Sequence, residues 1–147
     1  MPRQVAEIAA DFEALTARDF EYANAGARGW ERLDELCDEM RAVNDPATCA
    51  PVMFRAVERL DGVDLGVPGP LVHTLETWRG GYERLLAESV RRKPTLLSVW
   101  MVNRILNVRP PEADSWLALL RGVADNPTAS DETKAQAKLF IEHQAGG

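Results

Sequence analysis

His73 and Glu76 are the ionisable pair whose spacing could support shared chemistry, since they lie three residues apart in a segment predicted to be helical. That spacing places both side chains on one helix face, where they could share a proton or a ligand. The local sequence lacks a third partner, and two ligands do not make a metal site. We therefore favour a structural role for His73, hydrogen-bonded near its helix start, over contact with a partner, and we expect no bound metal or cofactor.

Sequence signatures of common catalytic sites are absent. There is no H-E-x-x-H pair, no Walker loop, no G-x-G-x-x-G following a strand and no G-x-S-x-G elbow. The two cysteines, Cys37 and Cys49, are too few for a disulfide framework and lack the C-x2-C spacing of zinc sites. We expect both to be reduced and buried, and the protein to have no enzymatic activity.

Polar residues interrupt the most apolar predicted helix, which begins at Pro94 or Thr95; these residues are Asn103, Arg104 and Asn107. An arginine on a central helix is costly unless it is paired and hydrogen-bonded. Arg104 is therefore expected to meet a carboxylate or several carbonyls, with Asp61 and Asp64 of the Gly/Pro-rich loop 61–70 as candidate partners. Together with His73, the three helix residues form a predicted structural polar cluster.

The elements that carry these residues are all predicted to be helices. Apolar residues recur at helical spacing almost throughout, and no stretch alternates with period two. Breaks at Pro, Gly and Asn separate seven or eight helices, at about 3–19, 29–43, 51–60, 70–79, 82–92, 95–107, 112–124 and 130–143. In the last of these, Ala135, Leu139 and Phe140 are expected to be buried.

Short connections between such helices favour antiparallel hairpins. We expect residues 1–147 to form one all-α domain, with the hairpins stacked as a HEAT-like α-α superhelix; a compact irregular bundle is the alternative.

Pro46 and Pro51 leave the start of the third helix open. Asp45 can cap a helix whose first residue is Pro46. A proline inside a helix removes a hydrogen bond and clashes with the carbonyl four residues before it. We therefore expect Pro46 to open a short turn and the helix to begin near Pro51, with a kinked helix as the alternative.

The charge of the chain is concentrated in its first half. The net charge is -6, and residues 1–74 hold 7 Lys/Arg against 14 Asp/Glu. Residues 75–147 hold 10 Lys/Arg against 9 Asp/Glu. The predicted helix 29–43 carries acidic residues on its polar face: Glu31, Asp34, Glu35, Asp38 and Glu39. Such a face favours fast association with a basic partner.

The basic stretch 79–109 holds seven Lys/Arg against two Glu, with Trp78, Tyr82 and Trp100 nearby. Stacking aromatics beside cations are typical of nucleic-acid binding. Helical packing needs these aromatics, however, and the net charge opposes phosphate binding. We expect these cations to be solvated or to pair with the acidic first half. The absence of a secretory signal or a membrane-length apolar run favours a cytoplasmic protein.

Two linked segments, G-x-P-G-P-L-V-H at 66–73 and W-M-x-N-R-x-x-N at 100–107, carry a resemblance. With Arg92-Lys93-Pro94-Thr95 between them, residues 60–108 resemble small, all-helical, HEAT-like bacterial immunity proteins of polymorphic and contact-dependent toxin systems. The resemblance implies that the protein binds and blocks a cognate toxin. A nuclease toxin carries a cationic cleft for phosphate, so the acidic face 31–39 is the expected contact, with Asp61 and Asp64 second.

Two other functions remain open. A HEAT-like protein could bind nucleic acid, or act in base excision like the alkylpurine glycosylases, which use Trp and Asp on a concave helical face. A structural adaptor or dimerisation module is the third reading, and the sequence leaves the oligomeric state undetermined.

Overall fold

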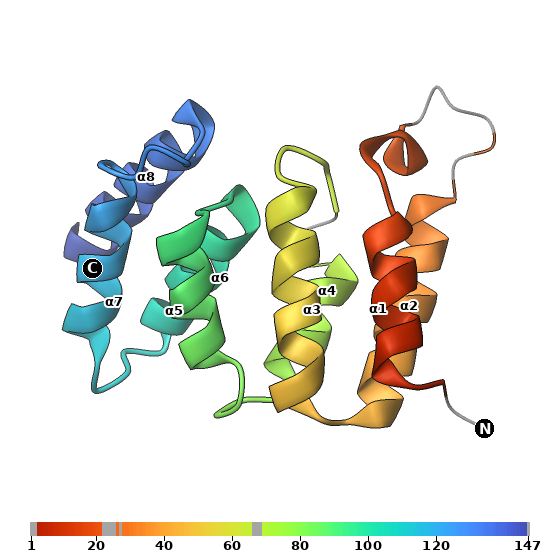
Figure 1. Cartoon of the computed structure of the whole chain (residues 1–147). Coiled ribbons are helices and arrows are strands. Elements are labelled where there is room, and N and C mark those ends of the chain that lie inside the picture. Colours follow the sequence, from red (N-terminus) through yellow and green to blue (C-terminus); the bar gives the residue numbers. More distant parts are fainter. Residues whose placement is uncertain (1–2, 22–25, 27, 66–68, 147) are drawn as a thin grey trace. The chain divides into compact units, whose positions relative to one another are not determined.

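The computed structural model describes residues 3–21, 26, 28–65 and 69–146. In this part of the chain there are eight α-helices and one short 3-10 helix, and no strand (Figure 1). The predicted all-α fold with seven or eight helices is thus confirmed. The chain forms two compact units, residues 1–85 and 86–147. The expectation of a single domain over 1–147 stays a prediction.

The first unit is a stack of two antiparallel helical hairpins. Its elements are α1 (Val5–Ala14), the 3-10 helix η1 (Ala17–Phe20), α2 (Gly29–Val43), α3 (Pro46–Arg59) and α4 (Gly69–Glu76). Helix α1 packs on α2 and on α3, and α4 packs on α2 and on α3. Figure 1 shows α1 beside α3 in one layer and α2 beside α4 in the other. This is the hairpin stacking predicted from the short connections.

Apolar burial holds these layers together, and one arginine joins α1 to α3 within a layer. The core includes fully buried side chains from α1, α2 and α3, among them Ile8, Phe12, Leu33, Leu36, Met40 and Phe54. Burying such side chains contributes about 1.5–3 kcal/mol each. Arg59 of α3 donates to the carbonyls of Phe12 and Leu15 at the end of α1. The Phe12 carbonyl also accepts the backbone N–H of Leu15 at 3.2 Å, so Arg59 adds a second donor to it and ties the end of α1 to α3.

The second unit contains most of α5 (Glu83–Arg92) together with α6 (Leu96–Asn107), α7 (Ala113–Val123) and α8 (Asp131–Gly146). Helix α6 packs on both α7 and α8, as expected for the most apolar element. Its start is a reciprocal cap: Ser98 N donates to Thr95 Oγ1 at 3.0 Å, and Thr95 N donates to Ser98 Oγ at 3.0 Å. The capped start confirms the prediction that this helix begins at Pro94 or Thr95 within a residue or two.

The prediction that the third helix begins near Pro51 is wrong, because α3 runs unbroken from Pro46 to Arg59. An interior proline costs about 3 kcal/mol. Cys49 and Ala50 before it, and Met53 and Phe54 after it, are all buried on the face that packs against the rest of the unit. Burial of Met and Phe alone contributes as much as the proline costs, so a continuous helix is favoured.

The prediction of which face of α8 is buried is also wrong. Leu139 is 57% exposed and Ala135 is exposed, whereas Thr133 and Ala137 are buried. Thr133, Ala137 and Gln144 follow one another at helical spacing on the side that meets α6, where Gln144 is hydrogen-bonded. Small residues on this side let α8 approach its neighbours closely, which outweighs the burial of Leu139.

Two glycines give opposite predictions for substitution by alanine. A Cβ at Gly29 would lie 2.5 Å from the carbonyl oxygen of Asp19 and 2.9 Å from Cδ1 of Phe20, whereas a Cβ at Gly122 has no neighbour within 4 Å. We expect Gly29→Ala to lower the free energy of unfolding by about 1–3 kcal/mol, because η1 and α2 must separate. Gly122→Ala should raise it by about 0.5 kcal/mol. Urea unfolding followed by circular dichroism compares them, and equal effects would contradict the close packing at Gly29.

Candidate protein-binding surface

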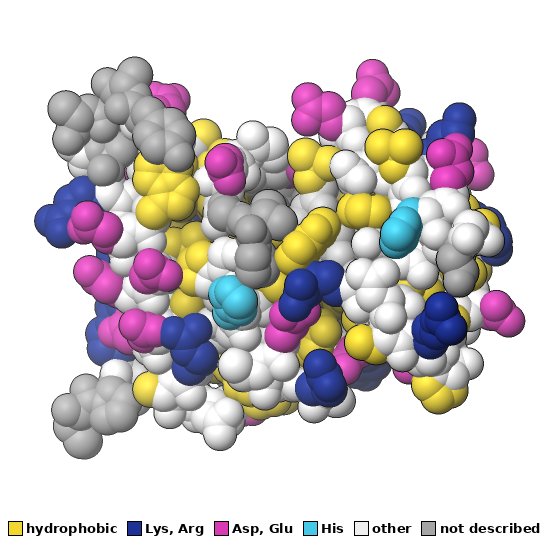
Figure 2. Space-filling view, turned by 180° about the vertical axis from the view of Figure 1, so that it is seen from behind, with side chains coloured by type: hydrophobic (Ala, Val, Ile, Leu, Met, Phe, Trp, Pro, Cys, Tyr) yellow, Lys and Arg dark blue, Asp and Glu magenta, His cyan; other side chains and the backbone are white. Residues whose placement is uncertain are grey.

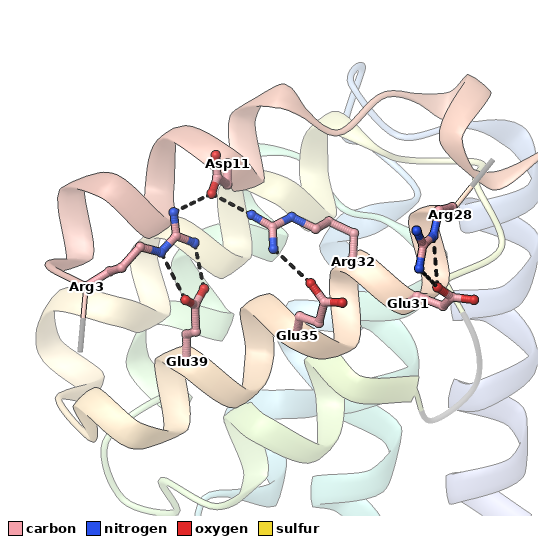
Figure 3. Close-up of polar contacts among 7 residues, drawn as sticks. All are labelled: Arg3, Asp11, Arg28, Glu31, Arg32, Glu35 and Glu39. Atoms are coloured by element: carbon pink, nitrogen blue, oxygen red, sulfur yellow. Dashed lines mark hydrogen bonds and ion pairs between the residues drawn. The ribbon is translucent and has the colours of Figure 1, made fainter. Parts of the chain in front are cut away.

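The polar side of α2 is joined to the start of the chain by Arg3. Its guanidinium donates to both carboxylate oxygens of Glu39, from Nε to Oε1 at 2.9 Å and from Nη2 to Oε2 at 2.7 Å. Its Nη1 donates to Oδ2 of Asp11 on α1 at 2.6 Å (Figure 3). Two-pronged arginine–carboxylate contacts fix orientation as well as distance. Arg3 therefore positions one carboxylate from each helix.

Asp11 is shared between two arginines. Its Oδ2 also accepts from Nη2 of Arg32 at 2.7 Å, and Nη1 of Arg32 donates to Oε2 of Glu35 at 2.9 Å. We call Arg3, Asp11, Arg32, Glu35 and Glu39 the α1–α2 charge network. Most of these side chains are about one-third to two-fifths exposed, and Glu35 is 59% exposed. The network therefore lies at the surface, where a partner can reach it.

The remaining acidic residues of α2 also meet arginines, with one exception. Glu31 accepts from Arg28 Nη2 at 2.7 Å. Asp38 accepts from Nη2 of Arg41, and Nη1 of the same guanidinium donates to Oγ1 of Thr74 at 2.6 Å. Asp34 is exposed and forms no ion pair with any described residue.

The acidic residues expected on the polar side of α2 are thus accompanied by arginines. Carboxylates and arginines are interleaved over this side of the unit, as Figure 2 shows. The spacing of three residues between Arg28 and Glu31, Arg32 and Glu35, and Asp38 and Arg41 was a visible signal for these pairs. Nothing in the local pattern indicated Arg3, which reaches Glu39 across 36 positions.

Arg3 lowers the pKa of two carboxyls of the network, those of Asp11 and Glu39. Hydrogen bonds from Arg3 hold the pKa of Asp11 and that of Glu39 below their usual values, against a smaller opposing effect of desolvation. Both groups therefore remain ionised at a lower pH than ordinary Asp and Glu side chains do.

The loop that carries Asp61 and Asp64 is tied to the start of α2. Nε1 of Trp30 donates to the backbone carbonyl of Asp64 at 3.1 Å. The Trp30 ring stands edge-on to Phe20, with centroids 5.5 Å apart. Asp64 is exposed and Asp61 is half-buried, while 66–68 lie outside the described residues. The second predicted contact region therefore adjoins the first at Trp30 and Glu31.

Two residues of the predicted polar cluster are linked within the second unit. Nε2 of Gln144 donates to the side-chain oxygens of Asn103 and Asn107, each at 2.8 Å, so these amides join α8 to α6. The guanidinium of Arg104 lies 4.8 Å from the ring centroid of Trp100, one turn earlier. This cation–π contact is an interaction that the sequence analysis did not consider.

His73 is exposed on α4 and belongs to the other unit. Pairing of Arg104 with Asp61 or Asp64 would likewise join the two units, and it stays a prediction.

The prediction of two reduced, buried cysteines is confirmed. Both are free and fully buried. Desolvation raises the pKa of Cys37 to about 12, so its thiol stays protonated and unreactive at neutral pH. Among residues 3–21, 26, 28–65 and 69–146, no three His, Cys, Asp or Glu side chains gather as a metal site would require.

Comparisons with known proteins add no relative to this picture. No family model matches the sequence, and no curated protein or solved structure is significantly similar to it. None of the described helices combines the length and apolarity needed to cross a membrane. The surface on α1 and α2 is therefore interpreted from its own geometry.

Because of the α1–α2 charge network, we expect the stability of the folded state to fall as the pH becomes acidic. A carboxyl whose pKa is lowered by folding stabilises the folded state above its unfolded pKa, here near 3.8 for Asp11 and 4.5 for Glu39. That contribution is lost as the pH falls through the lower, folded values. We expect the urea midpoint to drop between pH 5 and pH 3, and to drop less in Asp11→Asn.

Asp11→Asn should also be less stable at pH 7, because Arg3 and Arg32 then face each other without the shared carboxylate. Asp34→Asn is the matched control, since Asp34 lies outside the network; it should keep the native pH dependence. An Asp11→Asn curve parallel to the native one would show that the network does not form in solution.

Proposed function

We propose that this protein is a non-enzymatic binding protein that holds a basic protein partner against α1 and α2. In the immunity role that residues 60–108 resemble, the partner is a cognate bacterial toxin, blocked in the cytoplasm of the cell that makes it. The observation that carries the proposal is the α1–α2 charge network, in which arginines hold exposed carboxylates in fixed positions.

Fixed carboxylates suit recognition better than free ones. A long acidic side chain loses rotamer freedom when a partner immobilises it, which costs about 0.5–1.5 kcal/mol per side chain. Glu35 and Glu39 are already held by Arg32 and Arg3, so a large part of that cost falls on folding. The interleaved arginines also make the pattern specific, because a partner with the wrong register meets like charges.

The charge distribution along the chain also favours a basic partner. Residues 1–74 hold twice as many acidic as basic residues, 14 against 7. Asp34 and Asp64 are both exposed in this unit. An anionic surface speeds encounter with a basic protein, including a nuclease whose cleft must attract phosphate. Covering such a cleft would block it without any chemistry.

The nucleic-acid reading has less support. In that reading, the cations of the stretch 79–109 and the aromatic residues near them would contact the nucleic acid. Arg104 lies over Trp100 on the same helix, and Trp78 is buried with Nε1 donating to Asn44 Oδ1 at 3.1 Å. These groups are engaged within the protein, so they are poorly placed to stack on bases.

Asp34 provides the sharpest test of the proposed surface. The assay is a pull-down with the product of the adjacent reading frame, followed by stopped-flow measurement of association at low salt. We expect Asp34→Lys to lower the association rate constant about threefold to tenfold, because an exposed anionic position beside the network becomes cationic. Folding should be unaffected, since no described residue pairs with Asp34.

Asp125→Lys is the matched control, as an exposed carboxylate in the other unit. It should leave the association rate within a factor of about two, since it changes net charge equally but does not belong to the unit that carries α2. If the two variants slowed association equally, only net charge would matter and the surface would be misplaced. An adjacent product that does not bind the native chain contradicts the proposed function itself.

A further inference from the structure

A groove of about 700 Å³ lies within the second unit, between the end of α5 and the length of α7. The two helices run side by side in Figure 1. One wall comes from α5, the other from α7, and the turn 126–128 closes the end; the residues that shape the walls include Val90, Arg91, Arg92, Ala118, Leu119 and Gly122. None of these residues belongs to the surface on α1 and α2.

The end of α5 is unusual in carrying little exposed negative potential. The last carbonyls of a helix normally lack donors and attract cations. Here Asn126 Nδ2 donates to the carbonyl of Arg91 at 3.0 Å, and Thr128 Oγ1 donates to that of Arg92 at 3.2 Å. Lys93 Nζ in turn donates to the carbonyl of Thr128 at 2.5 Å. The turn is thereby fixed to α5, and the end of the groove is preformed.

The charged side chains that line the groove are all basic. They are Arg91 and Arg92, both exposed. The opposite wall is low and uncharged, since Ala118 and Gly122 are small and a Cβ added at Gly122 would have no neighbour within 4 Å. Leu119 adds a half-buried apolar side chain to this wall.

We propose that this groove binds an acidic peptide segment of a partner protein. Carboxylates of the segment pair with Arg91 and Arg92, whose planar guanidinium groups match carboxylate geometry. Small or apolar residues of the segment lie along Ala118, Leu119 and Gly122, where the open wall leaves room for them. The site differs from the proposed toxin-binding surface in its unit and in the charge of its ligand.

Nucleic acid fits the groove less well than an acidic peptide. A phosphate backbone needs a continuous track of cations, whereas here two arginines stand on one wall and face an uncharged wall. The net charge of -6 also repels a polyanion as a whole. A short acidic segment avoids most of this repulsion because it carries few charges.

The test uses the full chain as bait for a random nine-residue peptide library displayed on phage. Peptides that also bind the Gly122→Gln variant are subtracted, because glutamine at this position fills the groove. The subtraction removes basic peptides held by α1 and α2, so failure of the proposed function does not affect the outcome. We expect the remaining peptides to be enriched in Asp and Glu.

Selected peptides are then labelled with fluorescein and measured by anisotropy at low salt. Gly122→Gln should raise their Kd at least about tenfold without lowering the melting temperature, because glutamine favours the helix. Arg91→Glu with Arg92→Glu should have an effect of similar size. Arg84→Glu is the matched control on the same helix outside the groove, and should change Kd less than about twofold.

Three results would overturn the proposal. The first is a subtracted selection without acidic enrichment. The second is binding of labelled oligothymidylate that Gly122→Gln abolishes, which would make the groove a nucleic-acid site. The third is a dimer, seen by analytical ultracentrifugation, that Gly122→Gln dissociates, because a second copy of the chain would then occupy the groove.

Discussion

Asp11 is the residue on which the arrangement of the charged surface depends. A single carboxylate oxygen accepts from Arg3 on one side and from Arg32 on the other, at 2.6 and 2.7 Å. Two arginines at this proximity would repel each other without it. With Asp11 in place, Arg3 can hold Glu39 and Arg32 can hold Glu35. The polar side of α2 thus carries an ordered pattern of positive and negative charges in place of a diffuse negative field.

The two units differ in what their surfaces offer. The first presents carboxylates fixed by arginines on a stack of two hairpins, and the second presents a groove whose charges are arginines. Both sites are preformed by contacts within their own unit, the first through Arg3 and the second through Asn126 and Thr128. Preformed sites lose little freedom on binding, which suits the two binding functions proposed above.

The departures from the expected helices have a common physical cause. The third helix was expected to begin near Pro51, yet α3 continues through Pro51 and buries Cys49 and Ala50 before it as well as Met53 and Phe54 after it. On α8, Leu139 was expected inside, yet the small side chains of Thr133 and Ala137 are the ones that face the neighbouring helices. In both places the total packing of a helix against its neighbours outweighed the preference of one residue.

Local properties of the chain were readable from the sequence. Helical periodicity and Pro, Gly and Asn breaks predicted the all-α class, and α2 has the predicted bounds, Gly29–Val43. Burial of Cys37 and Cys49 followed from the habits of that residue type. Only the tertiary structure decided which face of α8 is inside, and that Arg3 reaches Glu39 across 36 positions. Periodicity shows that a helix has two faces, but a neighbouring helix selects one, and partners distant in the chain leave no local spacing to read.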